Sequence, residues 1–149
     1  MSLIFAMILL AANVEASDIK IVIECPLTGT DGAHHKILLG FGQEYISKVD
    51  TRSAVVLDPD KILNGMSVRS INIDETMRVG SKYAVIFGGD QDPTSILKLQ
   101  AVDLGAFEAT LISEKVKNMP SFAGRCFMID GPIASYVFKR RLSGQWGSK

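Results

Sequence analysis

Apolar side chains recur at every second position along most of this chain, and this period constrains the fold more than any other feature. In the segment 19–25, Ile21 and Ile23 point to one face of an extended chain, while Lys20 and Glu24 point to the other. The same alternation returns at 37–45, 55–57, 71–73, 83–87, 97–100, 107–111 and 122–126. A period of two is typical of antiparallel strands with one face in a core and one in water.

Residues that favour turns separate these segments. Examples are Asp58-Pro59-Asp60, Asn64-Gly65 and the run from Gly88 to Pro93. The only predicted helical turn is 113–118, which Pro120 ends. We therefore predict an all-β fold, in which an antiparallel meander of about eight strands forms a closed or nearly closed barrel. A two-sheet sandwich is the alternative.

The first residues differ from the rest of the chain. Leu3 to Ala12 is an uninterrupted apolar run, and small residues at Val14 and Ala16 follow it. This pattern predicts a signal peptide over residues 1–16, because the run is too short to span a bilayer. No Lys or Arg precedes the run. We expect an exported protein, periplasmic or secreted, with no membrane span.

The remaining chain is predicted to be one barrel domain over 17–130, followed by a C-terminal segment over 131–149. Val137 and Phe138 indicate a ninth strand, and the segment then becomes a basic polar tail that begins with Lys139-Arg140-Arg141. Such a tail is either a frayed terminus or a patch for anionic lipid or polysaccharide.

Two cysteines, Cys25 and Cys126, are the only ones in the chain. An even number of cysteines in an exported protein predicts a disulfide, because the compartments outside the cytosol are oxidising. The bridge would join an early strand to a late one. Two buried free thiols are the alternative.

Charge and composition exclude one class of partner. The chain has 16 basic and 16 acidic residues and no basic cluster of the size that nucleic acids require. We expect no nucleic-acid partner and no cofactor.

Few residues suggest catalysis. His34 and His35 are neighbours, so in a strand they would point to opposite faces and could not share a metal; we expect solvated turn residues. Asp90 and Asp92, in Asp-Gln-Asp-Pro-Thr, resemble the nucleophile loop of haloacid-dehalogenase-like phosphatases. That resemblance implies a magnesium site and aspartate chemistry. However, Gly88 and Gly89 separate the strand from the loop, and the family's helices are not predicted. A polar hairpin turn is the simpler interpretation.

The layout resembles small exported bacterial β-barrel proteins of unknown role, through Cys25 and the Gly124-Arg125-Cys126 motif. A narrower resemblance is to periplasmic inhibitors of C-type lysozyme, which are eight-stranded barrels with a Ser-Gly-x-x-Tyr inhibitory loop. Gly80 and Tyr83 match that pattern, whereas Val79 replaces its serine. The resemblance implies a partner-binding loop that includes Gly80, Lys82 and Tyr83.

Three functions follow as hypotheses. The first is an exported non-enzymatic binding protein, whose partner is another envelope protein or a small apolar ligand held inside the barrel. The second is a lysozyme inhibitor, and the third is a metal-assisted phosphatase-like enzyme. The absence of a convergent catalytic set favours the first.

Overall fold

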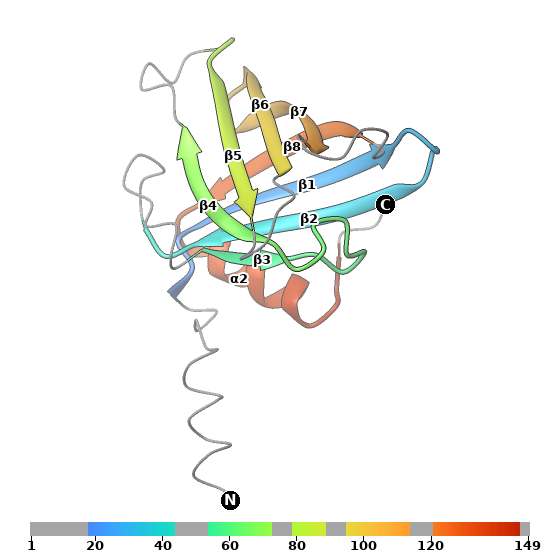
Figure 1. The fold of residues 1–149 in the computed structure, drawn as a ribbon. Helices are drawn as coiled ribbons and strands as arrows, with labels where there is room; N and C mark the ends of the chain where they lie inside the picture. Colours follow the sequence, from blue (N-terminus) through green and yellow to red (C-terminus); the bar gives the residue numbers. More distant parts are fainter. Residues whose placement is uncertain (1–17, 44–53, 73–78, 89–94, 114–120, 147–149) are drawn as a thin grey trace, which may run out of the picture.

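The computed structural model describes residues 18–43, 54–72, 79–88, 95–113 and 121–146. The described chain forms eight strands followed by a helix (Figure 1). Their bounds are β1 Ile21–Gly29, β2 His34–Phe41, β3 Val55–Leu57, β4 Ser67–Asn72, β5 Lys82–Gly88, β6 Ser95–Asp103, β7 Ala106–Ser113, β8 Phe122–Asp130 and α2 Pro132–Leu142.

All eight strands belong to one sheet, in the spatial order β3-β2-β1-β8-β7-β6-β5-β4. Every neighbouring pair is antiparallel, and β1 pairs with β2 on one side and β8 on the other. The sheet therefore curls into a nearly closed barrel with one unsealed seam, between β3 and β4. The predicted all-β meander is confirmed, and the barrel forms rather than the sandwich.

The barrel interior is built from the alternating positions that the sequence marks as apolar. In β6, Leu97 and Leu99 are buried while Lys98 and Gln100 are exposed. The buried interior cluster draws on all strands except β3, with Val56 of β3 packed against it, and Leu63 adds to it from the turn between β3 and β4. This continuous apolar interior provides most of the driving force for folding.

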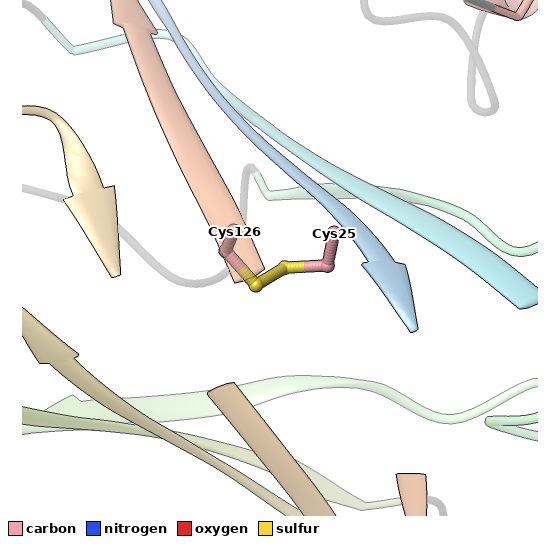
Figure 2. Close-up of a disulfide and its surroundings, with 2 residues drawn as sticks. All are labelled: Cys25 and Cys126. Carbon is pink, nitrogen blue, oxygen red and sulfur yellow. A yellow bond between two sulfur atoms is a disulfide. The ribbon is translucent and has the colours of Figure 1, made fainter. Parts of the chain in front are cut away.

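A disulfide between Cys25 of β1 and Cys126 of β8 lies inside the barrel (Figure 2). The two Cα atoms are 4.2 Å apart, and both cysteines are fully buried. A methyl group at Gly124 would collide with the Pro26 carbonyl oxygen and approach the Leu27 Cα atom to 3.2 Å. Glycine at this position therefore allows β8 to approach β1 closely beside the bridge. The predicted pairing of the cysteines is confirmed.

The prediction of a ninth strand at the C-terminal end is wrong. Val137 and Phe138 lie within helix α2, which begins with Pro132 in its first turn. Proline presets the helical backbone at that position. Lys139, Arg140 and Arg141 in the last turn interact favourably with the negative end of the helix dipole. Buried Ala134 and Phe138 are four residues apart, the spacing that puts two side chains on one helix face.

Helix α2 packs on the outside of the barrel, against β1 and β8. Its Phe138 ring belongs to a second, outer cluster with Val22 and Leu38, whose side chains point away from the interior. A methyl group on Gly40 would approach this ring to 3.1 Å, so glycine makes room for the helix. In the described part of the chain, no helix has the length and apolar character needed to cross a bilayer.

Candidate functional site

The largest concave surface that we describe lies on the outside of the barrel, beside the C-terminal end of α2. It is a solvent-open groove of about 930 Å³, which we call the outer groove. It is bounded by β1, β2, β8, the 58–66 turn and the chain after α2. Its lining residues are Glu24, Pro26, Leu27, Thr28, His34, His35, Lys36, Asp60, Phe127, Arg141, Gly144 and Trp146.

An ion pair at one wall ties the helix to the barrel. Glu24 of β1 points outward because its neighbours in the strand face the interior. The Arg141 Nε atom donates to Glu24 Oε1 at 2.5 Å, and its Nη2 atom donates to Oε2 at 3.3 Å. Both side chains are less than one-fifth exposed. A bidentate, partly buried pair holds its geometry better than a single surface contact.

The same arginine positions the only tryptophan of the chain. Its Nη1 atom donates to the Gln145 carbonyl oxygen at 2.7 Å, which fixes the residue before Trp146. The Trp146 ring centroid lies 5.8 Å from the Arg141 guanidinium carbon and 5.4 Å from Lys36 Nζ. Both distances are within the range of cation–π attraction. The tryptophan is therefore held half-buried at the edge of the groove.

The other walls combine polar side chains with apolar ones, which include Pro26, Leu27 and Phe127. The Lys36 backbone N–H donates to Asp60 Oδ2 at 3.0 Å, which joins the 58–66 turn to β2. His34 Nδ1 is within hydrogen-bond distance of Thr28 Oγ1, at 3.2 Å. Phe127 lies opposite Glu24 in the β1–β8 ladder, and 43% of it is exposed. The groove thus presents two aromatic rings among fixed charges of both signs.

The residues predicted for partner binding do not share one surface. Gly80 occupies the turn before β5 with a φ of 88°, a conformation that favours glycine. Lys82 is exposed, whereas the half-buried Tyr83 packs against the interior cluster, with its ring edge-on to Phe107 at 5.5 Å. Val79, where the inhibitors have serine, is 73% exposed. Lysozyme inhibition stays a prediction, and Lys82 and Val79 are the side chains of this turn that can reach a partner.

Asp90 and Asp92, the predicted metal and phosphatase residues, lie outside the described residues, as does the signal segment 1–16. Of the predicted helical turn at 113–118, only Ser113 is described, and it is the last residue of strand β7. Among residues 18–43, 54–72, 79–88, 95–113 and 121–146, no group of three or more His, Cys, Asp or Glu side chains could hold a metal ion.

The histidines begin β2 rather than occupying a turn. His34 is exposed, while His35 is half-buried with its ring edge-on to Phe122 at 5.1 Å. The expectation of two solvated turn residues is therefore correct only for the exposure of His34. Neighbouring positions of a strand point to opposite faces, which explains the difference between the two rings.

A small cavity lies in the described part of the barrel interior. It measures about 20 Å³ and lies among inward-facing apolar residues. A water molecule needs about this much room, whereas small-molecule sites usually exceed roughly 300 Å³. The residues around it are Ile23, Ile71, Tyr83, Val85, Leu99, Phe107 and Met128. This cavity does not accommodate the apolar ligand that the sequence led us to consider.

Sequence reasoning missed the outer groove. Its main side chains come from β1, β2, β8 and the end of α2, so no local motif contains them. Two signals were present nonetheless. Phe127 is an aromatic residue directly after Cys126, and Trp146 stands in a segment that is otherwise polar.

Comparisons of the chain with protein-family models, with curated proteins and with solved structures found no match.

Proposed function

We propose that this protein is an exported, non-enzymatic binding protein that contacts another protein through the outer groove. The observation that carries the proposal is the set of side chains in the groove, where Trp146 and Phe127 stand beside Arg141. Aromatic residues and arginine are enriched at protein–protein interfaces and contribute most of the binding energy there.

The contacts that hold the groove side chains in place support the same proposal. Arg141 is bonded to Glu24 and to the Gln145 carbonyl, and Trp146 lies against two cations. Side chains already held in place lose little conformational entropy when a partner binds. A groove of about 930 Å³ has room for several partner side chains, whereas the described interior cavity has room for about one water molecule.

Export is part of the proposal and has two independent supports. The first is the apolar run with small residues after it at the N-terminus. The second is the buried disulfide between Cys25 and Cys126, since disulfides persist mainly outside the reducing cytosol.

Site-specific photo-crosslinking tests the binding surface. A photoreactive amino acid replaces Phe127 in the groove in one variant and Leu104, which is 99% exposed in the β6–β7 turn, in a control variant. Each purified variant is irradiated with an envelope extract of the source organism. We expect a crosslinked protein from position 127 that is absent from position 104. Equal products from both positions, or none from position 127, would overturn the proposal.

The captured partner is then purified and titrated against variants. Phe127→Ser should weaken its Kd by at least about tenfold, because truncating a central aromatic anchor costs roughly 2 kcal/mol. Leu104→Ser should leave Kd unchanged. An unchanged Kd for Phe127→Ser contradicts binding through the outer groove.

A further inference from the structure

The side of α2 that faces away from the barrel combines apolar and basic residues. Ile133 is 59% exposed and Tyr136 is 55% exposed, and exposed Lys139 and Arg140 follow at helical spacing. Leu142, at the end of the helix, is 57% exposed. We call Ile133, Tyr136, Lys139 and Arg140 the outer face of α2. Three of the six exposed large apolar side chains in the described part of the chain thus lie on one helix of 11 residues.

The basic side chains of this face have no acidic partner in the described structure. The Arg140 guanidinium donates to the Tyr136 hydroxyl at 2.7 Å and stands 5.6 Å from its ring centroid. The only ion pair that α2 makes with described residues uses Arg141, on the side that meets β1. The charges of Lys139 and Arg140 are therefore available to an anionic surface.

The charge of the whole chain is distributed unevenly along the sequence. Four of the 16 basic residues and none of the 16 acidic residues follow Asp130. Residues 1–130 accordingly carry an excess of four acidic residues, although the chain is neutral overall. A negatively charged surface would attract α2 and repel the remainder, which orients the protein with α2 toward that surface.

We propose that the outer face of α2 docks on the surface of an anionic phospholipid bilayer. Helices that lie in a membrane interface present apolar and aromatic side chains to the acyl boundary and basic side chains to the headgroups. Tyrosine favours this depth because its ring is apolar and its hydroxyl is polar. Lys139 and Arg140 contact the lipid phosphates, while Ile133 and Tyr136 enter the boundary. This docking does not use the outer groove.

Vesicle co-sedimentation tests the docking. The purified exported protein is mixed with vesicles of phosphatidylcholine alone or of phosphatidylcholine with phosphatidylglycerol. We expect binding to the anionic vesicles only, and loss of binding at high salt. Lys139→Gln with Arg140→Gln should weaken partitioning about 30-fold, since each basic residue near such a surface contributes about 1 kcal/mol.

A matched control removes two positive charges elsewhere. Lys61→Gln with Lys98→Gln changes two exposed residues outside α2, one in the 58–66 turn and one in β6, and should leave partitioning unchanged. If both double variants weaken binding equally, net charge rather than α2 is responsible and the proposal fails. It also fails if the protein does not bind anionic vesicles.

A second variant distinguishes a bilayer from a soluble polyanion. Ile133→Ser with Tyr136→Ser keeps every charge but removes the side chains that would enter the lipid boundary, and both positions are exposed, so the fold should persist. Vesicle binding should fall at least about tenfold. Binding to dextran sulfate should not change. If the variant binds vesicles as well as the original protein does, the basic residues recognise anions in general and membrane docking is overturned.

Discussion

Strands β6 and β2 show how differently two parts of one barrel meet their surroundings. In β6, buried Leu97 and Leu99 alternate with exposed Lys98 and Gln100, so one face is in the core and one is in water. In β2, all residues from Ile37 to Phe41 are buried. The difference arises because Phe138 of α2 and Ile19 pack over the outward-facing positions Leu38 and Gly40 of β2, whereas nothing described covers the outer face of β6.

The cover that α2 provides on one side of the barrel explains where the outer groove lies. The covered side of the barrel has a second apolar cluster, around Val22, Leu38 and Phe138, outside the sheet. Where α2 ends, this cover stops and the outer groove begins, with Arg141 and Trp146 at its edge. The same helix therefore stabilises the outer surface and places the groove. Four predictions test this view, from the largest expected effect to the smallest.

Removal of the disulfide should have the largest effect, because it joins the covered strand β1 to the far end of the chain. Cys25→Ala with Cys126→Ala should lower the free energy of unfolding by about 4 kcal/mol, as the bridged residues are 101 positions apart and closing so long a loop restricts the unfolded chain. Urea denaturation measures the change. A loss below about 1 kcal/mol would show that the bridge contributes little to barrel closure.

A cavity made in the outer cluster and a cavity made in the barrel interior should affect different parts of the structure. Phe138→Ala and Leu97→Ala each remove a fully buried side chain, at a cost of about 3 kcal/mol. Amide hydrogen exchange should show faster exchange of α2 alone for Phe138→Ala, since the helix can separate from an intact barrel. For Leu97→Ala we expect faster exchange throughout β5, β6 and β7. If α2 stays fully protected in Phe138→Ala, the outer cluster is not a separate unit.

The same substitution at two glycines compares the contact between β1 and β8 with the contact between β2 and α2. Gly124→Ala should cost about 2–3 kcal/mol, because its methyl group meets the backbone of Pro26, which cannot move without separating β1 from β8. Gly40→Ala should cost about 1 kcal/mol, because the Phe138 ring that it meets can shift. Thermal unfolding of both variants measures the order. The reverse order would contradict the proposed role of Gly124.

The smallest effect is expected at the wall of the groove. Glu24→Gln removes the charge that holds Arg141 and should cost about 1 kcal/mol. Because Arg141 fixes the chain before Trp146, the emission of this single tryptophan should shift to longer wavelength. Glu108→Gln, on the exposed face of β7, is the control and should change neither quantity. An unshifted emission spectrum for Glu24→Gln would show that the ion pair does not position Trp146.

Much of the barrel could be predicted because alternation is a local property. The inward positions of β6 and β7, the strand count and the joining of Cys25 to Cys126 all follow from side-chain order and composition. Helix α2 was missed because its apolar face has only Ala134 and Phe138 fully buried, a short pattern that also fits a strand. The clearest sequence signal for a covering helix lies in the segment that forms β2. The consecutive apolar residues Ile37-Leu38-Leu39 indicate a strand buried on both faces, which requires a cover.

The outer groove shows the limit of such reasoning. Glu24, Phe127 and Arg141 are adjacent in space, yet Glu24 and Arg141 are 117 positions apart. Nothing in the neighbourhood of either residue in the sequence identifies the other. Pairing of β1 with β8, and the course of α2 across the outside of the sheet, bring them together.

By itself the sequence determined which side chains face the interior, since the two faces of an extended chain alternate regardless of what surrounds it. It also limited any disulfide within the chain to one pairing, since only two cysteines were present. The tertiary structure alone decided which outward face is covered, where α2 lies and which residues form the groove. The physical reason is that these contacts join distant segments, and their positions depend on how the closed sheet curves and which apolar surface remains to be buried.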